Sequence, residues 1–71
     1  MMMEQADIHV EVLGQEVIVR LPALGFEAVY FKPSGMAEMT LRRRSPTDDF
    51  RLLVRVRQAV NNKARALGWI A

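Results

Sequence analysis

The stretch "DIHVEVLGQEVIVRLP", residues 7–22, decides the fold that this sequence predicts. Apolar and polar residues alternate on both sides of Gly14-Gln15, and a period of two is typical of a half-buried β-strand. A two-residue loop with glycine first favours a type II′ hairpin turn. The apolar residues then meet on one face, in the pairs Val12 with Val17, Val10 with Val19, and Ile8 with Leu21. We therefore predict an antiparallel hairpin in this register.

Two further strands are expected after this hairpin, because Pro22 cannot donate a hydrogen bond to a sheet and ends the second strand. Composition places them at residues 26–32 and 37–42. Residues 33–36 between them contain proline, serine and glycine, which are ordinary turn residues. The predicted pairs are Lys32 with Ala37, Tyr30 with Met39, and Ala28 with Leu41. This register directs Met39 and Leu41 toward the core.

The opposite face of the predicted sheet carries apolar residues that no other segment covers. They are Ile18, Val29 and Phe31. Such patches often mark partner surfaces, and a domain of this size gains stability from burying surface against a second copy. We therefore predict a homo-oligomer that associates through these residues, with a homodimer as the commonest form. The alternative is a one-residue shift of the third strand, which would bury Val29 and Phe31 and expose Tyr30.

The stretch "TLRRRSPTDDF", residues 40–50, marks the end of the fourth strand and the start of a helix. Since Arg43 would point inward if the strand continued, we expect the strand to end near Arg42. Ser45 can cap the free amides of a helix, with Thr47 as a competing cap, and the proline between them is tolerated in a first turn. Two aspartates follow where the helix dipole favours negative charge.

The predicted helix continues to about Leu67, because apolar residues recur at steps of three and four. This stripe consists of Leu52, Leu53, Val56, Val60, Ala64 and Leu67. Gly68 fits the left-handed position that closes a helix, and Trp69 can pack back near the last turn. The predicted fold is a single α+β domain, a four-stranded antiparallel meander followed by one C-terminal helix (ββββα), with residues 1–5 disordered.

The composition of the 71 residues excludes several classes of site. The chain has no cysteine, which rules out disulfides and thiolate metal sites, and its one histidine leaves no pair of imidazoles for a metal. No apolar run approaches the roughly 18 residues of a membrane span. Residues 1–5 lack the features of a signal peptide. We expect a cytoplasmic protein with no membrane association, metal or cofactor.

The residues with catalytic potential are too scattered for an active site. His9 falls on the non-core face of the first strand, and the adjacent Asp48 and Asp49 diverge in direction on a helix. Ser34 and Ser45 lie in a turn and a cap, with no base beside either. The protein is therefore predicted to be a non-enzymatic interaction module, and its partner is unknown.

The charges are unevenly distributed along the chain. Residues 1–41 contain six acids and two bases, whereas residues 42–71 contain eight bases and two acids. Residues 50–66 of the helix carry five cations and no acid, although solvated helices usually mix the two signs. The predicted exposed face consists of Arg51, Arg55, Gln58, Asn62 and Arg65, and Arg42, Arg43 and Arg44 would extend it. These residue types contact phosphates and base edges, so a nucleic-acid-binding module is the alternative function.

Internal pairing is a different explanation of the helix cations. Arg57 and Lys63 flank the apolar stripe and could meet acids of the sheet, the candidates being Glu11, Glu16 and Glu38. Cations late in a helix also suit its dipole. The sequence is compatible with both explanations.

Three short segments resemble a group of short, uncharacterised bacterial proteins that end in a similar helix. The segments are "LP" at 21–22, "YFKP" at 30–33 and "NNKARALGW" at 61–69. The resemblance implies no function.

Overall fold

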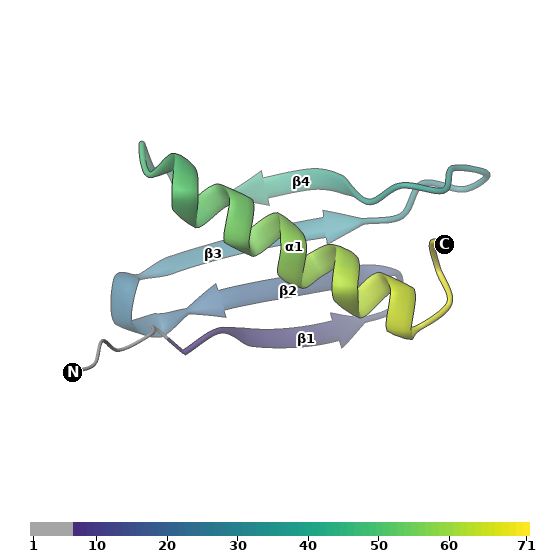
Figure 1. The fold of residues 1–71 in the computed structure, drawn as a ribbon, viewed down its shortest axis with the longest axis horizontal. Coiled ribbons are helices and arrows are strands. Elements are labelled where there is room, and N and C mark those ends of the chain that lie inside the picture. Colours follow the sequence, from purple (N-terminus) through teal and green to yellow (C-terminus); the bar gives the residue numbers. More distant parts are fainter. Residues whose placement is uncertain (1–6) are drawn as a thin grey trace.

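The computed structural model describes residues 7–71, and the predicted disorder of residues 1–5 lies outside this range. Its elements in chain order are β1 (His9–Leu13), β2 (Glu16–Leu21), a 3₁₀ turn (Pro22–Leu24), β3 (Phe26–Phe31), β4 (Thr40–Arg44) and α1 (Phe50–Ala66). The strands form one antiparallel sheet in the order β1-β2-β3-β4. Figure 1 shows α1 lying diagonally across one face of this sheet. The predicted α+β fold is confirmed.

The β1–β2 hairpin has the predicted register and turn. Its central pairs are Val12 with Val17 and Val10 with Val19. Gly14 has a φ of +62°, whereas no non-glycine residue between 7 and 71, Gln15 included, has a positive φ. These signs are those of a type II′ turn, because a type I′ turn needs positive φ at both central positions.

The core lies between α1 and the sheet and is centred on β2, the strand with which α1 makes most of its sheet contacts. The buried side chains of this cluster are Val17, Val19, Leu21, Phe26, Ala28, Tyr30, Met39, Leu52, Val56, Val60 and Ala64. Fully burying one valine or leucine side chain stabilises a fold by about 1.5–3 kcal/mol, so this cluster is the main source of stability. β1 is an edge strand, and its core-facing residues are only partly buried.

The connection between β3 and β4 is longer than the predicted turn. The N–H of Met36 donates to the carbonyl of Pro33 at 3.1 Å, and Gly35 at the third position has a φ of +79°. Proline therefore stands at the first position of this turn. Residues 37–39, which the sequence predicts as strand, form an irregular segment before β4.

The register of β4 against β3 also differs from the prediction. Tyr30 pairs with Leu41 and not with Met39, because Met39 leaves the strand and packs into the core. Leu41 is 41% exposed, since α1 does not cover this edge of the sheet. The prediction placed both residues in the core, and only Met39 is buried there.

A β-bulge corrects the predicted end of β4. The pairing shifts between Val29 and Tyr30, so that Arg43 stands opposite Val29, with one extra residue on β4. Arg43 consequently lies on the face away from α1, and its charge does not enter the core. The strand can therefore continue to Arg44, beyond its predicted end near Arg42.

The helix begins later than predicted, and its cap is Asp49. The carboxylate of Asp49 accepts a hydrogen bond from the N–H of Leu52 at 3.1 Å. Ser45 instead extends the sheet: its N–H donates to the carbonyl of Glu27 at 2.8 Å, and its hydroxyl accepts from the N–H of Glu27 at 3.0 Å. The Thr47 hydroxyl accepts from the N–H of Asp49 at 3.0 Å. Both predicted caps are therefore used elsewhere.

The end of α1 has the predicted form. Gly68 has a φ of +77°, and its N–H donates to the carbonyl of Arg65 at 3.0 Å. The N–H of Trp69 donates to the carbonyl of Ala64 at 2.8 Å, which completes a Schellman motif. Trp69 is half-buried and packs against the core, whereas Leu67 is 41% exposed and lies outside it.

Candidate nucleic-acid interface

The face of α1 that points away from the sheet is polar and cationic. All its predicted members are exposed, namely Arg51, Arg55, Gln58, Asn62 and Arg65. The first and last of these arginines lie about 21 Å apart along the helix axis, at 1.5 Å per residue. The Asn62 side chain accepts a hydrogen bond from Arg65 at 3.3 Å, which holds the last cation in this line. We call these five residues the cationic face.

Three acids of the sheet are paired on the side away from α1, which we call the outer face of the sheet. Among residues 7–71 the ion pairs are Arg20 with Glu11, Arg20 with Glu27 at 3.2 Å, and Arg42 with Glu16 at 2.9 Å. The hydrogen bond to Glu11 raises the pKa of Arg20, and the charges of both glutamates act in the same direction. The cations of α1 take no part in these pairs.

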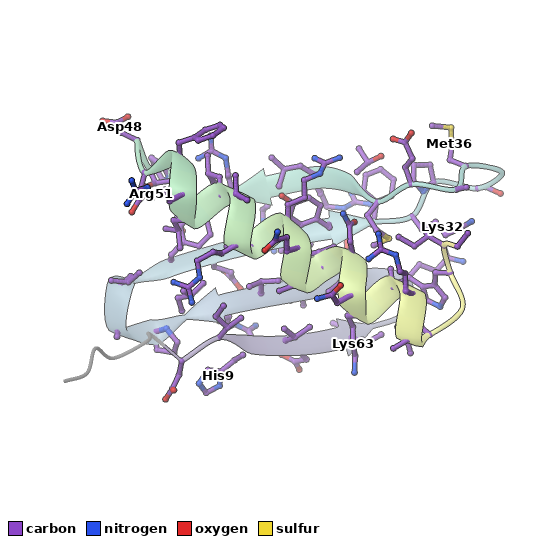
Figure 2. The ribbon with its side chains drawn as sticks, in the orientation of Figure 1. His9, Lys32, Met36, Asp48, Arg51 and Lys63 are labelled. Atoms are coloured by element: carbon purple, nitrogen blue, oxygen red, sulfur yellow. The ribbon has the colours of Figure 1, made fainter. Side chains whose placement is uncertain are left out.

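The positions of Arg57 and Lys63 do not fit the explanation by internal pairing. Neither residue is in an ion pair with an acid between residues 7 and 71. Arg57 is exposed, and Lys63 is half-buried on the side of α1 that lies over β1 (Figure 2). Neither residue therefore forms the suggested ion pair with Glu11, Glu16 or Glu38.

The three consecutive arginines of β4 do not extend the cationic face as one patch. Arg42 stacks over the ring of Phe31, with its guanidinium carbon 4.6 Å from the ring centroid, on the outer face of the sheet. Arg43 lies opposite Val29 on the same face. Arg44 is exposed and donates a hydrogen bond to the next carbonyl in the chain. Arg42 and Arg43 therefore lie on the outer face of the sheet, whereas Arg44 lies on the other face of β4.

The exposed apolar patch predicted on the outer face is absent. Ile18 and Val29 are on this face as predicted, but they are only 7% and 0% exposed. Phe31 is half-buried beneath Arg42. The long side chains of Arg20 and Arg42 lie on this face, held by their ion pairs with Glu11, Glu27 and Glu16. Self-association stays a prediction. The argument for it from exposed apolar surface no longer holds, because these residues are buried or half-buried.

A pocket that the sequence did not predict lies at one end of the molecule. It has a volume of about 560 Å³ and is lined by Gln15, Lys32, Ser34, Trp69 and three glycines. These residues come from the β1–β2 turn, the β3–β4 connection and the end of α1, which meet at the same end of the fold (Figure 1). The two turns of a meander that follow its odd-numbered strands always share one end, so the topology could have located this site. Only the tertiary structure brings Trp69 to it.

Of the residues with catalytic potential, Ser34 lines the pocket, and Ser45 and Asp49 make hydrogen bonds within the fold. His9 is exposed and pairs in register with Arg20, while Ser45 and Asp49 hold the sheet edge and the helix cap. Between residues 7 and 71 no cluster of three or more His, Cys, Asp or Glu side chains could hold a metal ion. In the same range, α1 is too short and too polar to cross a membrane, as is every other helical segment.

Comparison of the chain with protein-family profiles, curated proteins and solved structures gave no match. The resemblance to short bacterial proteins therefore stays a prediction. Only the geometry of the fold bears on function.

Proposed function

We propose that this protein is a non-enzymatic binding module whose cationic face on α1 binds nucleic acid. One observation carries the proposal. The acids Glu11, Glu16 and Glu27 are bound by Arg20 and Arg42 on the outer face of the sheet, whereas the exposed arginines of α1 have no ion-pair partner between residues 7 and 71. Arginines that no acid neutralises can pair with backbone phosphates and release their counterions.

The dimensions of the cationic face suit a nucleic-acid strand. Its length of about 21 Å corresponds to about six nucleotides, at 3.4 Å of helix axis per nucleotide in one strand. The arginines supply phosphate contacts, and Gln58 and Asn62 between them can donate and accept hydrogen bonds at base edges. The opposite side of α1 is buried against the sheet, so the face is presented by a fixed helix.

Salt dependence of binding tests this proposal. We expect labelled generic DNA and RNA to bind at low salt, measured by fluorescence anisotropy. Affinity should fall by roughly 0.9 log units per log unit of salt for each contact with a duplex phosphate. Replacing Arg51, Arg55 and Arg65 together with glutamine should flatten this slope by about 2 to 3 units, since up to three phosphate contacts are lost.

The matched control removes the same charge from other parts of the molecule. Arg43→Gln, Arg44→Gln and Lys63→Gln together also lower the net charge by three, and none of these residues belongs to the cationic face. This control should keep a slope close to that of the wild type. Absence of binding to any polynucleotide at low salt would refute the proposal. A flattened slope in the control alone would move the interface to the arginines of β4.

A further inference from the structure

The end pocket combines an aromatic surface with a cation. Trp69 and Lys32 line it from different parts of the chain, Trp69 from the end of α1 and Lys32 from the residue after β3. Both side chains are half-buried, and Figure 2 shows Lys32 beside the C-terminal segment. The volume of the pocket, about 560 Å³, is within the range of small-ligand sites, roughly 300–1,000 Å³.

Trp69 is held in place by its backbone as well as by packing. Its N–H donates to the carbonyl of Ala64 at 2.8 Å, and the left-handed Gly68 directs the chain back toward the core. Trp69 packs against the hydrophobic cluster and also lines the pocket. A tryptophan fixed in this way is a preformed stacking surface, which a free aromatic side chain is not.

The pocket lies at the end of α1 where the cationic face stops, since Gly68 and Trp69 in its wall follow Arg65 by three and four residues. Arg65, the last residue of that face, donates a hydrogen bond from its Nε to the carbonyl of Ala71 at 3.2 Å. This bond ties the cationic face to the segment that contains Trp69. A chain of phosphates lying along α1 would therefore reach the pocket at the end of the helix, where Lys32 supplies the next positive charge.

We infer that the end pocket receives one unstacked base of a single-stranded nucleic acid, which stacks on Trp69 while Lys32 contacts a neighbouring phosphate. This inference rests on the proposed function and specifies its ligand. Aromatic side chains beside a cationic track are the usual means of binding single strands. The bases of a duplex are stacked inside the helix and cannot enter such a pocket without being extruded. Ser34 and Gln15 at the wall offer a hydroxyl and an amide to the edge of the base.

The fluorescence of Trp69 tests stacking directly, because it is the one tryptophan of the chain. We expect a single-stranded oligothymidylate to bind by anisotropy and to quench this fluorescence. An abasic single strand of equal length and a duplex should bind through the cationic face without quenching it. Binding of the oligothymidylate without quenching would overturn the inference and leave the proposed function standing. Failure of all three ligands to bind would overturn both.

A mononucleotide separates a strand from a free nucleotide as the ligand. Thymidine monophosphate lacks the contacts with the cationic face, so we expect it to quench Trp69 only at far higher concentration than the oligonucleotide. Equal quenching by both ligands at equal concentration would overturn the inference, since the pocket would then act independently of α1.

Variants give a second measurement of the same contact. Trp69→Leu should weaken binding of the oligothymidylate roughly tenfold, as expected for loss of one stacked base, and leave binding of the abasic strand unchanged. Phe50→Leu is the matched control, because Phe50 is an aromatic residue at the opposite end of α1 and is 75% exposed. Lys32→Gln avoids the core contacts of Trp69 and should also weaken the oligothymidylate complex. Unchanged affinity in both Trp69→Leu and Lys32→Gln would refute the inference.

Discussion

Arg42 on the outer face of the sheet is expected to stabilise the fold through its position over Phe31. Its guanidinium stacks on the Phe31 ring, pairs with Glu16 at 2.9 Å, and covers part of that ring on the face of the sheet away from α1. Arg42→Ala removes all three contacts at once. We expect the variant to fold, with a lower free energy of unfolding than the wild type.

The magnitude follows from the three contacts. A partly exposed cation–π contact contributes about 0.5–1 kcal/mol. The ion pair is solvated, with side chains that are 48% and 30% exposed, and such pairs contribute about 0.2–1 kcal/mol. Uncovering about 20–40 Å² of the Phe31 ring costs roughly 0.5–1 kcal/mol at 25 cal/mol per Å². The expected loss is about 1–3 kcal/mol, and each kcal/mol lowers the midpoint of thermal unfolding by about 4–8 °C in a domain of this size.

Urea unfolding followed by circular dichroism measures this loss. Arg44→Ala is the matched control, because Arg44 is exposed on the same strand and makes only a hydrogen bond to the adjacent carbonyl. It should cost less than about 0.5 kcal/mol, as is usual for surface substitutions. Arg42→Met keeps an apolar cover without the charge and should be intermediate. Equal stability of the Arg42→Ala and Arg44→Ala variants would refute the covering role of Arg42.

Two further predictions concern the helix cap and self-association. Asp49→Ala should lower the free energy of unfolding by about 1 kcal/mol, because the N–H of Leu52 loses its acceptor. Substitution of the exposed Asp48 should lower it little. Equal losses in urea unfolding would show that Asp49 is not the cap. Phe31→Glu should leave the sedimentation behaviour of the folded protein unchanged, since Ile18 and Val29 beside it are buried within one chain. If the wild type is a dimer and this substitution dissociates it, the outer face of the sheet is a contact between copies after all.

The features that the sequence predicts correctly are set by interactions between residues close together in the sequence. The register of the first hairpin follows from the alternation of side chains about a two-residue turn, and a shift by one residue would turn the valines of one strand away from the core. The end of α1 follows from Gly68, whose positive φ any other residue would adopt only at a cost. The exposed side of α1 follows in the same way from the period of its apolar stripe.

The start of the helix shows where local signals are insufficient. Ser45, Thr47 and Asp49 are all suitable caps by residue type. The choice between them depends on Ser45 being bonded to Glu27 at the edge of the sheet, and that contact joins residues 18 positions apart. The local sequence around Ser45 does not indicate that Glu27 is its partner. The sequence therefore favours Ser45, the first suitable residue, as the cap.

The path of β4 was decided by tertiary structure alone. Met39 packs into the core and does not pair in the strand, and the bulge that follows places Arg43 on the face away from α1. The same shift brings Arg42 over Phe31, and thereby covers the face that the predicted register left exposed. Alternation along a strand indicates which of its residues are apolar. The register of an edge strand such as β4 also depends on the elements that pack on the two faces of the sheet beside it. That information exists only once the helix and the sheet have packed together.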